Sequence, residues 1–106
     1  MYALHMIKKR MNQIEKRIET IKADLSGIDD MRPGSLTSQY KDPEKTNGPY
    51  YQISYTHEMN SCTNYVKKSK VNEVRQQIKN YKRFKALTTE WVSLGIEYSQ
   101  LKMKLK

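Results

Sequence analysis

Apolar residues recur with heptad spacing over the first quarter of the chain, and this pattern constrains the fold more than any other feature. From Leu4 to Ile28 they are separated by 3, 4, 3, 4, 3, 4 and 3 residues. Isoleucine and leucine in so narrow a stripe predict a helix over residues 3–28, in a coiled coil or a two-helix hairpin. Gly27 and Pro33 should end this helix. The expected partner or oligomer contacts on it are Leu4, Ile7, Met11, Ile14, Ile18, Ile21 and Leu25.

A second helix is predicted over residues 69–105. Ser69 is a candidate N-cap, and apolar residues follow it at helical spacing. Between Ile78 and Leu87 the intervals are all three residues, which breaks the heptad phase and should rotate the apolar stripe around the helix. The helix therefore divides into a basic half, up to Lys85, and an apolar half. The expected partner or oligomer contacts on this helix are Phe84, Trp91, Tyr98 and Leu101.

The segment between the helices is predicted to hold a loop and a β-hairpin. Residues 31–49 contain all three prolines among small polar residues, a composition typical of a loop. In residues 50–67, aromatic and β-branched side chains alternate with polar ones on both sides of a polar break, which predicts the hairpin. The expected fold is a single α+β domain, mainly α, over residues 1–106. It has two long helices in a coiled-coil-like hairpin, with the β-hairpin inserted between them.

Composition limits the size of the core and the cellular compartment. With 106 residues, 37% of them hydrophobic, and a mean hydropathy of -0.90, the chain has little material for a thick core. We therefore expect a homodimer that forms through the isoleucine-rich seam. A single cysteine excludes an intrachain disulfide and favours a reducing compartment. Because no apolar run approaches the roughly 20 residues that span a bilayer, we expect a cytoplasmic protein without a membrane partner.

Positive charge is concentrated in one tract. The chain has 20 basic and 11 acidic residues, a net charge of +9. Between Val66 and Lys85 lie eight basic residues and one acid, Glu73, so this tract alone contributes +7. A ridge of this kind favours phosphate groups, because lysine and arginine displace the counterions of a nucleic acid. The expected phosphate-binding residues are Lys67, Lys68, Lys70, Arg75, Lys79, Lys82, Arg83 and Lys85.

Other polar and aromatic residues near the tract are candidates for contacts with bases. The amides of Gln76 and Asn80 are suited to hydrogen bonds with base edges or phosphates. Tyr51 and Tyr55, on the predicted hairpin, could stack on bases. Each observation also has a simpler explanation: a lysine-rich face keeps a coiled coil soluble, and tyrosines form ordinary cross-strand pairs in a small sheet.

Catalytic chemistry is poorly supported by the sequence. The two histidines, His5 and His57, do not form a metal-binding pair. His57 and Cys62 could meet across the predicted turn as a thiolate dyad, but a half-buried thiol and a turn histidine are the preferred explanation. We therefore expect a protein that is not an enzyme, with no catalytic residues, no metal, no cofactor and no small-molecule substrate.

Several motifs together are similar to those of a known family. They are RPGSLTSQY at residues 32–40, GPYYQISY at 48–55 and TNYVKKSKVNEVRQQIKNYKRFKAL at 63–87, followed by Trp91. In this order they resemble an uncharacterised family of short proteins from bacterial and archaeal mobile elements. Many members have a cysteine cluster, suggestive of a zinc knuckle, where this chain reads KDPEKTN at residues 41–47. The resemblance implies a setting in mobile DNA but assigns no activity.

Two functions are compatible with these patterns. The first is a small basic accessory protein of a mobile element that binds nucleic acid, DNA rather than RNA, through the phosphate backbone. The second is a coiled-coil interaction module that docks onto a larger mobile-element or defence protein as an adaptor, subunit or inhibitor of a nucleic-acid enzyme.

Overall fold

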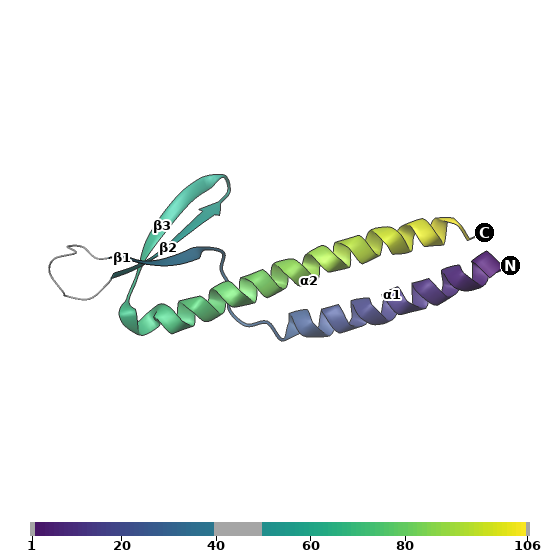
Figure 1. The fold of residues 1–106 in the computed structure, drawn as a ribbon, viewed down its shortest axis with the longest axis horizontal. Helices are drawn as coiled ribbons and strands as arrows, with labels where there is room; N and C mark the ends of the chain where they lie inside the picture. The colour runs from purple at the N-terminus through teal and green to yellow at the C-terminus, as the bar shows by residue number, and fades with distance from the viewer. Residues whose placement is uncertain (1, 40–49, 106) are drawn as a thin grey trace. The chain divides into compact units, whose positions relative to one another are not determined.

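The computed structural model describes residues 2–39 and 50–105, and it confirms the predicted mixture of helices and antiparallel sheet. The order of elements is α1 (Tyr2–Ser26), β1 (Ser35–Gln39), β2 (Tyr50–His57), β3 (Asn60–Val66), the 3-10 helix η1 (Lys68–Lys70) and α2 (Val71–Met103), as drawn in Figure 1. The chain divides into two compact units. We call residues 1–28 with 83–106 the helical unit, and residues 29–82 the sheet unit; α2 contributes to both.

The helical unit has a small apolar interior contributed by α1 and by the second part of α2. The side chains of Ile14 and Ile21 on α1 are fully buried, with 0% exposure, and Leu87 on α2 is also buried. Ile14 and Ile21 are separated by one heptad, so they lie on the same side of α1. A single copy of the chain therefore buries two residues of the seam through which we expected a homodimer to form.

Three ion pairs join α1 to α2 within the helical unit. Arg10 contacts Glu97, Arg17 contacts Glu90, and Arg83 lies 3.8 Å from Asp24. Successive pairs are seven residues apart on both helices, in opposite chain directions. The more specific prediction, that the helices pack as a coiled-coil-like hairpin, stays a prediction.

The sheet unit contains three antiparallel strands in the order β1-β2-β3. The predicted hairpin is confirmed as β2 and β3, which are paired from Tyr51 opposite Val66 to His57 opposite Asn60. Glu58 and Met59 turn the chain between them with φ of 50° and 68°, as a two-residue hairpin turn requires. The buried core of this unit combines the sheet with the first turns of α2 and consists of Ile53, Val66, Val71 and Ile78.

The structure corrects two predictions about local structure. Residues 35–39, predicted as loop, form the edge strand β1, which pairs with β2 from Ser35 opposite Ser54 to Gln39 opposite Tyr50. This strand has a single apolar residue, Leu36, so it shows no alternation that periodicity could detect. Ser69 does not cap α2, because it lies inside η1 and α2 begins at Val71. The remainder of the predicted loop, residues 40–49, lies outside the described part of the chain, as does the position of the cysteine cluster.

Candidate nucleic-acid interface

The basic tract is exposed along its whole length. The side chains of all eight predicted phosphate-binding residues are exposed to solvent. Lys67, Lys68 and Lys70 lie in and just before η1, while Arg75, Lys79 and Lys82 lie on the first three turns of α2. These six residues belong to the sheet unit, whereas Arg83 and Lys85 belong to the helical unit.

Few of these cations are neutralised. Lys70 lies 3.4 Å from Glu73, and Arg83 lies 3.8 Å from Asp24. None of the other six forms an ion pair with a carboxylate among residues 2–39 and 50–105. Five of the six basic-tract residues in the sheet unit are therefore exposed and without a carboxylate partner among the described residues: Lys67, Lys68, Arg75, Lys79 and Lys82.

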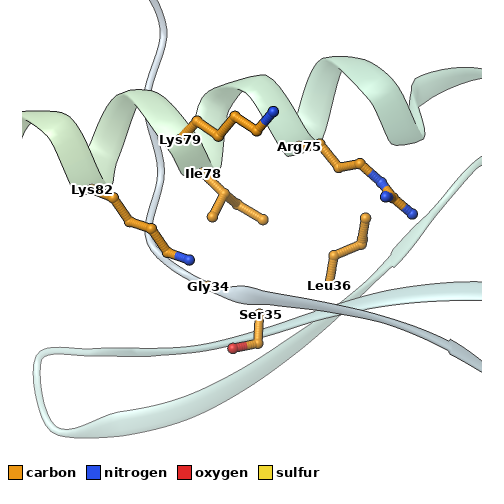
Figure 2. A pocket seen from close by; sticks show the side chains of 7 residues that line it. All are labelled: Gly34, Ser35, Leu36, Arg75, Ile78, Lys79 and Lys82. Atoms are coloured by element: carbon orange, nitrogen blue, oxygen red, sulfur yellow. The ribbon is translucent and has the colours of Figure 1, made fainter.

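Three of the cations surround a cavity between α2 and β1. Its volume is about 440 Å³, and its lining residues are Gly34, Ser35, Leu36, Arg75, Ile78, Lys79 and Lys82. Figure 2 shows Arg75 and Lys82 reaching from α2 toward β1 on either side of Ile78, with Lys79 running along the helix between them. No acidic residue lines this cavity. Leu36 on β1 and Ile78 on α2 are its apolar lining residues, so the cations border a partly apolar hollow.

Hydrogen bonds to α2 hold the chain segment that leads into β1. The backbone N–H of Arg32 donates to the carbonyl oxygen of Gln77 at 3.2 Å. The side-chain amide of Asn80 donates to the carbonyl oxygen of Asp30 at 2.8 Å, and that of Gln76 donates to Oδ1 of Asn80 at 2.9 Å. Both amides that we expected to contact bases are therefore engaged within the unit. In this arrangement they position β1 against α2.

Gly34 allows the strand to approach the core closely. Its φ is +145°, and a Cβ atom there would lie 2.6 Å from Cγ1 of Ile53. Real Cβ atoms do not approach other atoms so closely, so only glycine fits without displacing a buried side chain. Gly34 thus fixes where β1 begins, and with it one wall of the cavity.

The two predicted base-stacking tyrosines have structural partners in the sheet unit. Tyr51 is half-buried and packs against the core cluster. The ring of Tyr55 lies under the guanidinium of Arg32, with 4.8 Å between Cζ and the ring centroid. Arg32 also donates from Nη2 to Oδ1 of Asn64 at 3.3 Å. These contacts agree with the simpler interpretation of the tyrosines, as packing residues of a small sheet.

Arg32 is a residue whose structural importance the sequence did not reveal. Its guanidinium links β2 and β3 through Tyr55 and Asn64, and its backbone reaches α2. The sequence marks Arg32 only by its position in the RPGSL motif. A search for clustered charge misses it, because it lies far from the basic tract along the chain. Its Nε atom is buried without a hydrogen-bond partner in the described part of the chain.

Most of the predicted partner residues are covered within one copy of the chain. Ile14 and Ile21 are fully buried. The half-buried ones are Ile7, Met11, Ile18, Leu25, Phe84, Trp91, Tyr98 and Leu101. Two of the aromatic residues contact α1: the hydroxyl of Tyr98 donates to Glu15 at 2.7 Å, and Nζ of Lys22 lies 5.7 Å from the ring centroid of Trp91. Among these residues only Leu4 is exposed, at 45%.

A different row of apolar side chains on α2 is exposed to solvent. Val92, Ile96 and Met103 are 63%, 56% and 75% exposed, and with Ser99 they recur at intervals of 4, 3 and 4 residues. Sequence periodicity did not single them out, because the larger residues of the buried stripe dominate the same helix. These three side chains are therefore more exposed than the predicted partner residues of α2.

His57 and Cys62, the residues of the candidate thiolate dyad, each contact another group. The thiol of Cys62 donates to the carbonyl oxygen of Asn60 at 3.7 Å, and Nε2 of His57 lies 3.7 Å from Glu58. No hydrogen bond joins His57 to Cys62 in this part of the chain. Within residues 2–39 and 50–105 there is also no group of three or more His, Cys, Asp or Glu side chains able to hold a metal ion.

No helix in the described part of the chain is both long and apolar enough to cross a bilayer. In comparisons with protein-family models, curated proteins and solved structures, no significant match to the chain was found.

Proposed function

We propose that this protein binds nucleic acid through the phosphate backbone, with the basic surface of the sheet unit as its contact face. The observation that carries the proposal is the exposed, uncompensated charge of Arg75, Lys79 and Lys82 around a cavity without acidic residues. Cations in this state gain most from replacing the condensed counterions of a nucleic acid. Lys67 and Lys68 extend the same excess of charge at the start of the helix.

The contacts available on this face favour phosphate over base recognition. Asn80 donates to Asp30, and Gln76 donates to Asn80, so both amides suited to reading adenine already make hydrogen bonds within the sheet unit. Lysine and arginine on phosphates position a protein without conveying sequence information. We therefore expect binding with little dependence on sequence. The resemblance to proteins of mobile elements favours DNA over RNA and an accessory role in that setting.

A salt titration with matched charge variants tests this proposal. Affinity for a fluorescein-labelled 30-base-pair duplex, measured by anisotropy, should fall steeply as salt rises, with log Kd changing by about 0.9 per phosphate contact per decade of salt. The triple variant K67Q/K68Q/K79Q should bind more weakly and with a shallower slope. The control K8Q/K9Q/K16Q removes the same charge from exposed positions of α1, so it should bind nearly as the wild type does. No binding to duplex, single strand or RNA at low salt would overturn the proposal.

A second candidate function is that of a protein-interaction module. The exposed stripe of Val92, Ile96 and Met103 favours it, because soluble proteins seldom leave a regular apolar row on a helix uncovered. In this role the protein would dock onto a larger nucleic-acid enzyme as an adaptor, subunit or inhibitor. A homodimer through the buried isoleucines is disfavoured, so a second copy would use this stripe instead. Loss of a native co-purifying partner in a V92E/I96E variant would support this function.

We further propose a hairpin architecture for the helical unit and a cytoplasmic location for the protein. The three ion pairs at heptad intervals support an antiparallel, coiled-coil-like hairpin in the helical unit. A single cysteine, with no disulfide possible within the chain, supports a cytoplasmic location. The proposed role is binding and not catalysis.

A further inference from the structure

We propose that the cavity between α2 and β1 is a binding site for a single phosphate group, held by Arg75, Lys79 and Lys82. The inference rests on the proposed function and deepens it, because it separates one defined site from the diffuse charge of the surface. Its volume of about 440 Å³ falls within the range of small-ligand pockets, so a phosphate group and part of its attached sugar fit inside.

The arrangement of the cations supports one group rather than a row of separate contacts. Arg75, Lys79 and Lys82 are spaced by four and three residues, so they lie on one face of α2 within about 10 Å along its axis. In Figure 2 the guanidinium of Arg75 and the ammonium of Lys82 reach toward β1 from opposite sides of Ile78. A tetrahedral anion seated above Ile78 is therefore approached from both ends of the cavity. Arginine suits this role because its planar fork donates two parallel hydrogen bonds to phosphate oxygens.

The surroundings of the cavity separate it from the rest of the basic surface. Leu36 and Ile78 also line the cavity, and apolar side chains beside a bound anion strengthen its attraction to the cations. Its far wall is the start of β1, held in place by Gly34 against Ile53 and by Arg32 against Gln77. Lys67 and Lys68 are exposed and do not line this cavity. They serve as the internal comparison.

The phosphate has two possible sources in a nucleic acid, a terminal monoester and an internal diester. Both present tetrahedral anionic oxygens, and the monoester carries up to twice the charge at neutral pH. A pair of 20-mer oligonucleotides of one sequence, with and without a 5′-phosphate, separates them. Tighter binding of the phosphorylated strand by the wild type, with the difference lost in Arg75→Gln, identifies the terminal group. Equal binding of both strands, weakened equally by Arg75→Gln, identifies the backbone.

The experiment begins with inorganic phosphate, so that it does not depend on nucleic-acid binding. In the full-length protein, phosphate added at constant ionic strength should shift the backbone amide NMR signals of Gly34, Ser35 and Leu36 along a saturable curve. Chloride at the same ionic strength should not. Leu36→Trp fills the cavity without altering charge and should abolish these shifts. Arg75→Gln and Lys82→Gln change exposed residues and should each weaken phosphate binding about tenfold, whereas Lys68→Gln should change it less than about twofold.

The possible outcomes separate this inference from the proposed function. Saturable phosphate shifts at the cavity without binding of any oligonucleotide uphold the site and overturn the proposed function. Oligonucleotide binding without such shifts, and with Arg75→Gln no weaker than Lys68→Gln, overturns the site and leaves the proposed function standing. If Leu36→Trp does not fold, as judged by its amide spectrum, the comparison of Arg75→Gln and Lys82→Gln with Lys68→Gln decides the matter.

Discussion

Arg10 of α1 and Glu97 of α2 form a bidentate ion pair, with Nε 2.6 Å from Oε2 and Nη2 2.8 Å from Oε1. The same fork-to-carboxylate geometry recurs seven residues along each helix, where Nη2 of Arg17 lies 2.7 Å from Oε1 of Glu90. The hydrogen bonds and charge of the arginines hold the pKa of both glutamates below its usual range. These contacts connect α1 to α2 across more than seventy residues of sequence.

The stability of the helical unit should fall in acid. A glutamate whose pKa is lower in the folded than in the unfolded state stabilises the fold above its unfolded pKa, about 4.3, and loses this contribution as the pH falls through the folded pKa. We therefore expect the helical circular dichroism to melt at progressively lower temperature as the pH falls below about 5.

The matched control for this pH dependence is the double variant E90Q/E97Q. It lacks both titrating groups of the bidentate pairs, so its melting temperature should be lower than that of the wild type at neutral pH. That temperature should also fall less on acidification. Equal slopes for wild type and variant over the same pH range would show that these two pairs do not contribute.

The buried isoleucines of α1 should carry much of the stability of the helical unit. Ile14→Ala removes methyl and methylene groups from a fully buried position and leaves a cavity. We expect a loss of about 2–4 kcal/mol in the free energy of unfolding, measured with urea. The control Leu4→Ala alters a side chain that is 45% exposed and should cost less than about 1 kcal/mol. Similar costs for the two variants would mean that the seam is not buried as described.

Gly34 should tolerate no side chain, in contrast to Gly95. A Cβ at Gly34 would meet Ile53 at 2.6 Å with φ at +145°, so Gly34→Ala combines backbone strain with overpacking. We expect it to destabilise the sheet unit by about 2–4 kcal/mol. Gly95 lies within α2, and a methyl group added there would have no neighbouring atom within 4 Å, so Gly95→Ala should stabilise the helix by about 0.5–1 kcal/mol. The midpoint of thermal unfolding should fall for Gly34→Ala and rise for Gly95→Ala. An unchanged midpoint for Gly34→Ala would contradict the close approach of Gly34 to Ile53.

Periodicity was sufficient to predict the two helices and the hairpin, because burial on one side of a regular element leaves a repeating trace in the sequence. The heptad spacing in α1 and the alternation around Ile53 are such patterns, and Ile14, Ile21 and Ile53 are fully buried. The exposure of the basic tract could also be expected from the sequence, since lysine and arginine are almost never fully buried without a partner.

The edge strand β1, the cavity and the exposed stripe depend on contacts between distant parts of the chain. Leu36 is the only apolar residue of β1, so pairing with β2, and not a local pattern, makes residues 35–39 a strand. The cavity between α2 and β1 depends on the hydrogen bonds of Asp30 and Arg32 to α2, which bring β1 beside Arg75 and Lys82. Likewise, α2 has apolar residues on more than one side. Which of them is buried depends on contacts with residues far away in the sequence, such as those of Tyr98 with Glu15 and of Trp91 with Lys22.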